Sequence, residues 1–596
     1  MNHEPNKIML DDIFLQVNKP GRYIGQEWNM PQKDFEKGNV KFALCFPDLY
    51  EVGMSNLGVR IIYDILNNIA DVSCERFFSP DIDMERILRL GNTEIFSLES
   101  KRRLKEFDII GFSLGYELDY ANVLNILDLG SLPLKSSLRD STYPLVIGGG
   151  PCVLNPEPMY EFFDLFVLGE AEEVILEIID IYRNYKDKFK AGKISKQDLL
   201  IMLSQIEGVY APGLYEVVYD DAGKIEKFKP KTTEVPLRIK KRFVRDLNNS
   251  SFPLNWLMPH IQIVHDRISL EIMRGCPHSC RFCQARSQYF PLRFRDLNHI
   301  LNLAYNIYKR TGYEEISLGG LSVSDYAHIE ELLKALVNLF KEKAVGLSLP
   351  SIKPRNYVGS LSALIATIKK TGLTFAPEAA TERLRKILAK DFNEEDFFKA
   401  IEEAYASGYQ HVKLYFMIGL PYEELQDLDG IIDFVIRVSE LRKKMHKNPA
   451  WVNISINTLI PKPHTPFQWL KMQDLDSIKY KQDYLKSKVR NRRLKLSFHN
   501  RYMSFLEGVF SRGDRRLSQV ISCAFKRGAR FDAWENHFRF SQWEAAFLES
   551  NIDPNFYLQD KSRDEFLPWD FLDIGISKES LRSEFEKISE AISYGA

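Results

Sequence analysis

Short apolar segments alternate with longer helical patterns along most of this chain, and this alternation restricts its fold more than any other feature. Nearly continuous apolar runs are typical of parallel strands buried on both faces. The first series comprises VKFALCFP (40–47), FDIIGFSL (107–114), YPLVIGGG (143–150) and FDLFVLGE (163–170). We predict a doubly wound, flavodoxin-like α/β domain over residues 40–215, with ligand crevices where glycine or acidic residues follow its strands.

A second series of predicted strands starts near residue 268. Its members are ISLEIMRG (268–275), YEEISLGGL (313–321), KAVGLSLPS (343–351), GLTFAPEA (372–379), HVKLYFMIGLP (411–421) and WVNISINTLIP (451–461). Six strand–helix repeats predict an open, partial (βα)6 barrel over residues 261–480, because a closed barrel needs eight. The strand pattern then fades, which predicts a mainly helical domain over 481–596. Residues 1–39 are interpreted as an extension and the polar stretch 216–260 as a connector.

The overall charge gives no reason to expect a nucleic acid or a membrane as partner. The 596 residues include 80 basic and 81 acidic side chains, for a formal charge of -1. The N-terminus lacks the basic start and apolar run of a secretory signal, and no segment approaches the ~20 apolar residues of a membrane-spanning helix. We therefore expect a cytoplasmic protein with no membrane partner.

Three of the seven cysteines, Cys276, Cys280 and Cys283, lie within eight residues in the pattern C-x3-C-x2-C, directly after a predicted strand. Three thiolates can hold a cubic iron–sulfur cluster and leave its fourth iron without a protein ligand. Zinc is the rival metal, but structural zinc sites usually have four ligands with paired C-x2-C spacing, and no second pair is present. His278, inside the loop, is a candidate fourth ligand.

A C-x3-C-x2-C loop after the first strand of a partial βα barrel resembles the radical S-adenosylmethionine (SAM) superfamily. The resemblance implies that Cys276, Cys280 and Cys283 hold a [4Fe-4S] cluster and that SAM chelates its open iron. An electron from an external donor, passed through the cluster, would cleave SAM to methionine and a 5′-deoxyadenosyl radical. That radical would abstract a hydrogen from the substrate, with the protein supplying position and exclusion of water.

The same resemblance assigns residues to SAM binding. Phe282 matches an aromatic residue beside the adenine, and FMIGLPYEE (416–424) resembles the strand-five element on the same side. The glycines of SLGGL would let backbone approach the SAM amino group. The ends of the next two strands would meet the ribose and carboxylate. The implied SAM residues are Phe282, Gly319, Gly320, Ser348, Ser351, Glu378 and Arg383.

The first domain resembles the cobalamin-binding domains that precede the barrel in part of this superfamily. VIGGGPCVLNPEP (146–158) and VLGEAEEVILEI (167–178) are similar to their glycine-rich turn and Gly-Glu element. One departure is clear: the cobalt-ligating D-x-H-x-x-G loop is replaced by GMSNLG (53–58), so no histidine of this loop can bind cobalt. The implied cobalamin residues are Ser55, Gly58, Ser113, Gly148, Gly149, Gly169 and Glu170.

Several phrases together, among them FPDLYEVGMSNLG, VHDRISLEIMRGCPHSCRFCQA and SFLEGVFSRGDRR, resemble an uncharacterised radical SAM family with a cobalamin-type N-terminal domain. Other residues support different interpretations. Cys45, Cys74 and Cys152 resemble the dispersed cysteines that hold a second cluster in methylthiotransferases, although a buried thiol is the simpler state for Cys45. The basic segment 486–502, with interleaved aromatics, is either an RNA-binding stretch or a solvated helix face.

Three functional readings follow. The leading one is a radical SAM enzyme that cleaves SAM reductively and transfers a methyl group through cobalamin to an unknown substrate. The second keeps the cluster without cobalamin and modifies RNA or protein, as methylthiotransferases do. The third is a non-catalytic metal-cluster protein that binds RNA or a protein partner. His464 and Trp469, just past the sixth strand, are expected near the barrel mouth, with interdomain packing as the alternative for Trp469, and Cys523 is expected in the core.

Overall fold

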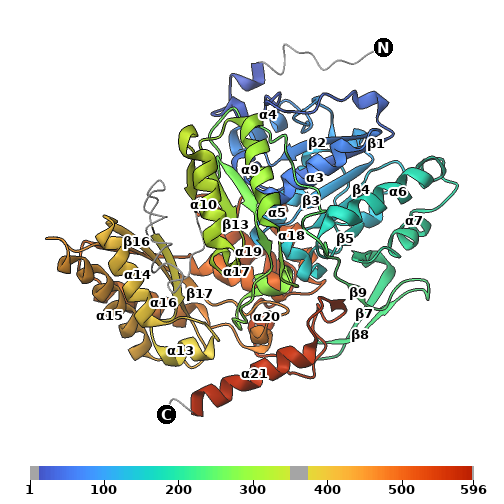
Figure 1. The fold of residues 1–596 in the computed structure, drawn as a ribbon. Helices are drawn as coiled ribbons and strands as arrows, with labels where there is room; N and C mark the ends of the chain where they lie inside the picture. The colour runs from blue at the N-terminus through green and yellow to red at the C-terminus, as the bar shows by residue number, and fades with distance from the viewer. Residues whose placement is uncertain (1–11, 349–372, 594–596) are drawn as a thin grey trace.

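The N-terminal domain is built on a six-stranded sheet in the order β2-β1-β3-β4-β5-β6. A computed structural model describes residues 12–348 and 373–593 of the chain (Figure 1). All neighbouring strands of this sheet run parallel except β5 and β6. The order has its topological switch point between β1 and β3, where flavodoxin-like folds bind ligands. The strands are β1 (Val40–Phe46), β2 (Val72–Phe78), β3 (Ile109–Ser113), β4 (Leu145–Gly149), β5 (Leu165–Val167) and β6 (Val209–Tyr210).

Strand β2 is one that the sequence did not reveal. Its sequence VSCERFF carries Glu75 and Arg76, yet all seven residues are buried. Both side chains have polar partners: Glu75 accepts a hydrogen bond from the Ser100 hydroxyl at 2.6 Å, and Arg76 forms an ion pair with Glu27 at 2.8 Å. A charged pair inside a strand breaks the apolar run that identifies buried strands, so the pattern fails where burial depends on distant partners.

Helices cover both faces of the sheet (Figure 1). Helix α3 begins where the Asn56 side chain accepts from the Val59 amide at 3.0 Å, a normal N-cap. The helices of this domain are α2 (Tyr50–Gly53), α3 (Leu57–Asn68), α4 (Ile82–Leu90), α5 (Tyr120–Leu129), α6 (Ala171–Lys190) and α7 (Lys196–Leu203). The connector then forms a hairpin and a short strand, β7 (Tyr215–Tyr219), β8 (Ile225–Pro230) and β9 (Ile239–Lys240).

The barrel domain contains two parallel sheets, β10-β13-β14 and β15-β16-β17-β18. Its strands are β10 (Ile268–Glu271), β13 (Glu315–Gly319), β14 (Gly346–Ser348), β15 (Leu373–Glu378), β16 (His411–Ile418), β17 (Trp451–Thr458) and β18 (Leu494–Phe498), with a small ribbon of β11 (Met273–Arg274) and β12 (Arg293–Phe294). The six predicted strands are all present. Strand β18 is additional, and it lies inside the basic segment 486–502.

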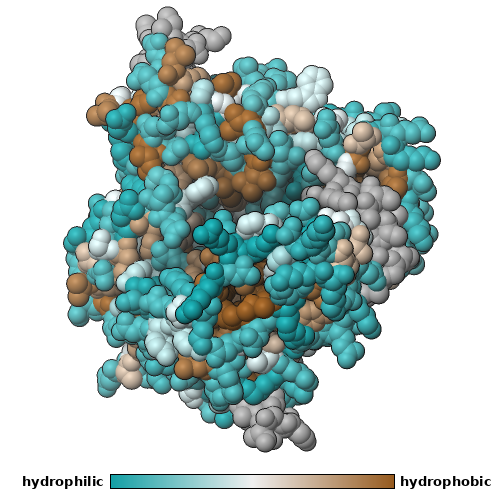
Figure 2. All heavy atoms as spheres, turned by 90° about the vertical axis from the view of Figure 1, so that its left-hand side faces the viewer, coloured by the Kyte–Doolittle hydropathy of each residue, from teal (hydrophilic) through white to brown (hydrophobic). Residues whose placement is uncertain are grey.

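The helices of this domain are α8 (Gln284–Gln288), α9 (Leu297–Thr311), α10 (Ile329–Phe340), α13 (Glu382–Ile387), α14 (Glu394–Ala406), α15 (Leu425–Leu441) and α16 (Leu475–Lys488). Helices α9, α10, α14, α15 and α16 bury their apolar sides in one core with these sheets, whereas α13 packs in a separate small apolar cluster. The half that contains β16 and β17 lies at the left of Figure 1. On the face shown in Figure 2, hydrophilic residues predominate and apolar ones lie mainly in hollows.

The C-terminal region is mainly helical, as predicted, and it contacts both α/β domains. It comprises α17 (Arg501–Arg512), α18 (Leu517–Lys526), α19 (Phe540–Glu549), α20 (Asn555–Leu558), β19 (Leu572–Asp573) and α21 (Lys578–Ser593). Helix α18 packs on α5, strand β19 pairs with β9, and α21 lies alongside α13 (Figure 1). The predicted fold class is confirmed. Among the described residues, no helix combines the length and apolar character needed to cross a bilayer.

Candidate active site

The three clustered cysteines lie on the loop that joins β11 to α8. Gly275 starts this loop with φ of 94°, and a Cβ there would lie 2.8 Å from the Leu292 Cα, so only glycine fits without strain. All three thiols are partly exposed. The Cys283 amide donates to the Cys280 carbonyl at 3.2 Å, which keeps the second half of the loop compact. The loop therefore presents three thiols at the carboxyl end of the first barrel strands.

Arg281 ties the cysteine loop to the other half of the barrel. Its amide donates to the Leu388 carbonyl at 2.9 Å, and its guanidinium donates to the Ile387 carbonyl at 2.8 Å. These carbonyls belong to the end of α13, where helices leave carbonyl groups without intrahelical donors. One arginine thus satisfies a helix end and holds the loop in position.

The surroundings of the three cysteines distinguish between two kinds of metal centre. Among the described residues, no three His, Cys, Asp or Glu side chains converge on one metal ion. Thiolates that bind different irons of a [4Fe-4S] cluster need no such common point. His278, the candidate fourth ligand, instead contacts Asp325 at 2.6 Å and Asp391 at 3.7 Å. The residues present fit a three-cysteine cluster better than a four-ligand zinc site.

Gly319 and Gly320, predicted to approach SAM, lie at the end of β13 beside the cysteine loop. A Cβ on Gly320 would lie 2.5 Å from the Met273 side chain, and one on Gly319 would lie 3.3 Å from the Leu270 carbonyl. Ser348 is buried at the end of β14, opposite Ser317 in the register. Ser351 lies outside the described residues. The predicted glycines and Ser348 therefore end neighbouring strands.

Glu378 ends β15 with φ of 67°, an uncommon conformation for a non-glycine residue. Its carboxylate lies 3.5 Å from the Lys390 ammonium. Burial raises the pKa of Glu378 despite the opposing effect of Lys390. Burial likewise raises the pKa of the Cys280 thiol to about 11, while Lys390 acts in the opposite direction. Lys390 thus lies close to two of the predicted residues, and sequence reasoning missed it because no motif marks a lysine after α13.

Arg383, predicted to pair with the SAM carboxylate, already has a carboxylate partner in the chain. Its guanidinium forms an ion pair with Asp427 and donates to the Tyr422 carbonyl at 3.0 Å. Asp427 is buried at the start of α15 and also accepts from the Thr381 hydroxyl at 2.6 Å. This network connects the segments that follow β15 and β16. A SAM carboxylate would have to compete with Asp427 for this guanidinium.

Phe282 contributes to a small apolar cluster at the carboxyl ends of β15, β16 and β17. Its neighbours include Ala379, Met417 and Leu420, together with Phe585 of α21. The FMIGLP segment therefore lies beside Phe282, as the resemblance implied. The C-terminal helix α21 packs against this end of the barrel through Phe585.

A cavity of about 600 Å³ separates the N-terminal domain from the barrel. It lies at the carboxyl ends of strands in the N-terminal sheet and in the barrel sheet β10-β13-β14. The carboxyl ends of strands are where α/β folds bind ligands. Its walls contain residues that the sequence assigned to two different cofactors, namely Gly58, Ser113, Gly149, Gly169 and Glu170 from the first domain and Gly319 and Gly320 from the barrel. The structure thus brings five of the predicted cobalamin residues and two of the predicted SAM residues to one chamber.

Glycines and apolar side chains shape the wall that the N-terminal domain contributes. A Cβ built on Gly115 or Gly149 would meet nothing within 4 Å, so both positions open directly onto free space. Phe42 and Leu44 of β1 line the chamber between α3 and α6. Such a wall suits a large, mostly apolar ligand that approaches the backbone closely. The described lining contains no histidine, consistent with the GMSNLG departure.

Two predicted cobalamin residues have packing or interdomain contacts rather than a place in the cavity wall. A Cβ on Gly148 would lie 2.8 Å from the Phe166 ring, so this glycine accommodates an aromatic side chain. The Ser55 hydroxyl donates to the Glu51 carbonyl at 2.7 Å and accepts from the His265 amide at 3.0 Å. Ser55 therefore links the GMSNLG loop to the start of the barrel domain.

Glu170 lines the cavity, but its carboxylate is held by the barrel domain. It lies 2.7 Å from the Arg293 guanidinium and 2.8 Å from that of Arg274, and it accepts from the Val244 amide at 2.8 Å. Burial raises the pKa of Glu170, but these hydrogen bonds and charges outweigh it and hold the pKa below its usual value. The Gly-Glu element thus forms an ionic connection between the two domains.

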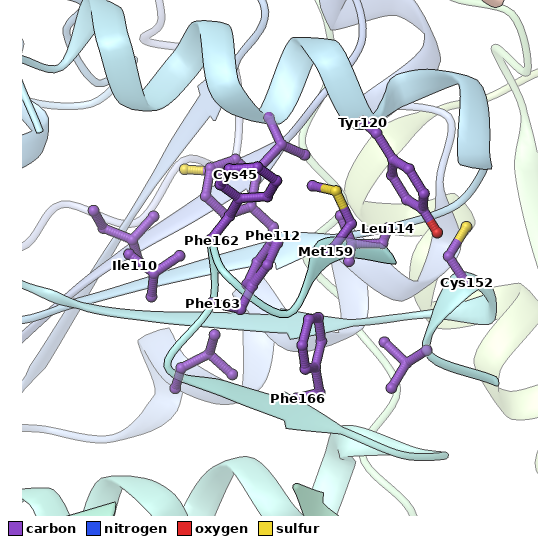
Figure 3. Close-up of a cluster of buried hydrophobic side chains, with 14 of the residues drawn as sticks. Cys45, Ile110, Phe112, Leu114, Tyr120, Cys152, Met159, Phe162, Phe163 and Phe166 are labelled. Carbon is purple, nitrogen blue, oxygen red and sulfur yellow. The ribbon is translucent and has the colours of Figure 1, made fainter. Parts of the chain in front are cut away.

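The cysteines of the first domain are buried among apolar side chains. Cys45 lies on β1 close to Phe112 and Phe162, and Cys152 lies near Tyr120 at another part of the same core (Figure 3). Burial raises the pKa of Cys45, Cys74 and Cys152 well above the usual thiol value. Cys523, expected in the core, is instead partly exposed on α18.

His464 and Trp469 are both buried and do not line the 600 Å³ cavity. The His464 ring contacts the Leu154 carbonyl of the first domain at 3.0 Å, and burial lowers its pKa to about 3. The Trp469 ring packs edge-on against Phe585 of α21 at 5.6 Å. Trp469 therefore takes part in interdomain packing, which was the alternative prediction. His464 likewise contacts another domain and does not line the cavity.

Comparison with known proteins identifies the family. Residues 58–212 match the model described as "Radical SAM proteins, N-terminal", and residues 270–435 match "Radical SAM superfamily". The uncharacterized protein MJ0966 of Methanocaldococcus jannaschii is 30% identical over 482 residues, which cover 80% of this chain and 90% of that protein.

Two solved structures are similar at low identity. The radical SAM methyltransferase TsrM from Kitasatospora setae, with cobalamin and a [4Fe-4S] cluster bound, is 12% identical with a TM-score of 0.48, over 86% of this chain and 99% of that chain. The cobalamin-dependent enzyme OxsB, with aqua-cobalamin bound, is 13% identical with a TM-score of 0.44, over 93% of this chain and 80% of that chain. On the sequence relationships and the cysteine loop, this chain belongs to the radical SAM superfamily.

Proposed function

We propose that this radical SAM enzyme holds its [4Fe-4S] cluster on Cys276, Cys280 and Cys283, binds cobalamin in the interdomain cavity, and methylates an unactivated carbon of its substrate. The observation that carries this proposal is the cavity of about 600 Å³. The wall formed by the N-terminal domain has the open glycines that a bulky cofactor needs. The wall formed by the barrel includes Gly319 and Gly320, the two glycines predicted to approach SAM. A methyl carrier in that space would lie between the cobalamin-type domain and the radical site.

The residues of the chain have separable tasks in this proposal. When bound, the cluster supplies the electron that cleaves SAM, and cobalamin supplies a cobalt that carries methyl groups. Arg281 positions the cysteine loop, and Phe282 offers an apolar surface beside it. The ion pairs of Glu170 with Arg274 and Arg293 hold the domains together. A closed interface would keep water from the radical, as such chemistry requires.

Anaerobic reconstitution tests the cofactor content directly. We expect about four irons per chain, as one [4Fe-4S] cluster requires, a cobalamin absorption band, and reductive cleavage of SAM to 5′-deoxyadenosine. About eight irons without cobalamin would favour the sulfur-inserting reading. Bound zinc without SAM cleavage would contradict both enzyme readings.

Filling the cavity tests the cobalamin assignment separately. In Gly149→Leu the new side chain would project into the open space beside β4, and we expect cobalamin binding to fall while iron content stays unchanged. Gly213→Leu is the matched control, because Gly213 is exposed on the short 3-10 helix Pro212–Leu214 and a Cβ there also meets nothing within 4 Å. Gly115→Leu repeats the test from the loop that follows the neighbouring strand β3. Unchanged cobalamin content in both cavity variants would refute this use of the cavity.

A further inference from the structure

The sheet β15-β16-β17-β18 has one buried face and one exposed face. Along β16 the residues Val412, Leu414 and Phe416 are buried in the core, whereas the alternate positions are exposed or half-buried until Met417. Strand β17 repeats this alternation. Parallel strands buried on both faces show no such pattern. The exposed face of this sheet is therefore available for a partner.

An aromatic and cationic stack forms the amino-terminal edge of this face. The rings of His411 and Trp451 lie side by side in the register, with their centroids 6.4 Å apart and their planes 13° apart. The Arg493 guanidinium lies 5.5 Å from the Trp451 ring. Trp451 nevertheless remains 42% exposed. A flat, exposed ring supported by a second ring and a guanidinium is a suitable surface for stacking a nucleobase.

The next row of the same face carries positive charge. Thr374, Lys413, Asn453 and Lys495 are neighbours across the four strands. The Lys413 ammonium lies 4.6 Å from the Tyr415 ring centroid, which supplies a second aromatic residue on the face. Within the described part of the chain, no carboxylate forms a salt bridge with Lys413, Lys495, Arg490 or Arg492. These charges remain available for phosphates.

The exposed face runs toward the cysteine loop. His411, Lys413, Tyr415 and Met417 follow one another on the same side of β16, because side chains alternate along a strand. Met417 then packs in the apolar cluster that contains Phe282. Six residues of strand span about 20 Å. A single-stranded nucleic acid bound on this exposed face could therefore extend to the cysteine loop.

We infer that this face binds a single-stranded polynucleotide and that this polynucleotide is the substrate, an inference that rests on the proposed function. Stacking rings beside unpaired lysines and arginines are the combination by which sheet surfaces bind single strands. The net charge of -1 did not predict this basic surface, because its positive charge is confined to one face of the molecule. The basic segment recognised in the sequence contributes Arg493 and Lys495 to this surface, and the exposed Arg490 and Arg492 lie in the turn that leads into β18.

Fluorescence anisotropy with the reconstituted full-length enzyme tests the inference. The probes are a fluorescein-labelled 12-nucleotide RNA, a DNA of the same sequence, and a polyglutamate peptide of equal charge. Trp451→Ala should weaken nucleic-acid binding between about 5-fold and 150-fold, the range for loss of one stacked base. Trp451→Phe should restore most of the binding. A difference between RNA and DNA identifies the sugar that the face prefers.

The charge contribution is measured through salt dependence. The double variant Lys413→Glu with Lys495→Glu should lower the slope of log affinity against log salt by about 1.4, since each phosphate contact on a single strand contributes about 0.7. Lys399→Glu is the matched control, because Lys399 is exposed on the outer helix α14 of the same domain.

The outcomes separate this inference from the proposed function. Polyglutamate binding as tight as RNA binding, or equal RNA binding by wild type and Trp451→Ala, would overturn the nucleic-acid inference even if SAM cleavage is intact. Loss of SAM cleavage or cobalamin binding with RNA binding retained would instead count against the proposed function. Stimulation of SAM cleavage by the bound oligonucleotide in wild type, but not in Trp451→Ala, would support both.

Discussion

Substitution of Glu170 should weaken the junction between the two α/β domains through loss of one buried charge. Among the residues that the structure describes, Glu170 is the acidic partner of Arg293, and both side chains are less than 10% exposed. Removing one partner of a buried ion pair costs about 3–5 kcal/mol, because the other charge stays buried without compensation. Arg274 keeps Glu172 and Glu271 as partners. We therefore expect the lower end of this range, about 3 kcal/mol, for Glu170→Gln.

A double-mutant cycle isolates the pair from the other effects of each substitution. Glu170→Gln, Arg293→Met and the double variant are unfolded in urea and followed by circular dichroism and tryptophan fluorescence, with free energies compared where both probes coincide. We expect a coupling energy of about 2–3 kcal/mol, within the range for residues in contact. The matched cycle uses Glu173 of α6 and Arg242 of the connector, a more exposed pair 2.8 Å apart, which should couple by less than about 1 kcal/mol.

The pH dependence has a definite sign. The folded-state pKa of Glu170 is held below its usual value, so its stabilising contribution is present above about pH 4.3, the ordinary pKa of glutamate, and is lost as the pH falls through the lowered folded value. The difference between wild type and Glu170→Gln should shrink under acid conditions. A coupling energy below about 0.5 kcal/mol would refute the ionic role. Loss of cobalamin with unchanged unfolding would assign Glu170 to the cofactor instead.

Three other predictions concern single side chains. Cys280→Ala should remove the iron and abolish SAM cleavage, whereas Cys523→Ala on α18 should change neither; retained cleavage in Cys280→Ala would contradict the cluster assignment. His278→Gln should keep about four irons per chain, because His278 contacts Asp325, and iron loss measured by a colorimetric assay would make it a ligand. Burial raises the pKa of Asp532 to about 7, so the folded protein holds a proton there that the unfolded chain has lost. The free energy of unfolding should therefore fall between pH 4 and pH 7, by up to about 4 kcal/mol. In Asp532→Asn, urea unfolding should show a smaller fall over the same pH range.

Features that depend on local sequence were predictable. The cysteine spacing and the apolar runs of β1, β3 and β4 identified the loop and the strands, because their signals come from neighbouring residues. Strand β2 was missed since its charges are satisfied by Glu27 and Ser100, which no local pattern connects to it. Strand β18 was missed because its exposed lysine and serine face solvent, so its sequence resembles a basic polar segment.

The predicted site residues divide by whether their role depends on a partner. A glycine needs no partner to leave space, and Gly149, assigned from a motif, is found at the cavity wall, whereas the neighbouring Gly148 accommodates the Phe166 ring. A charged side chain binds whichever opposite charge the fold brings nearest. Glu170 meets Arg293, 123 residues away, and Arg383 meets Asp427, 44 residues away. A motif therefore locates a charged residue without identifying its partner, and only substitutions that test both partners together can separate a cofactor ligand from an ion pair between domains.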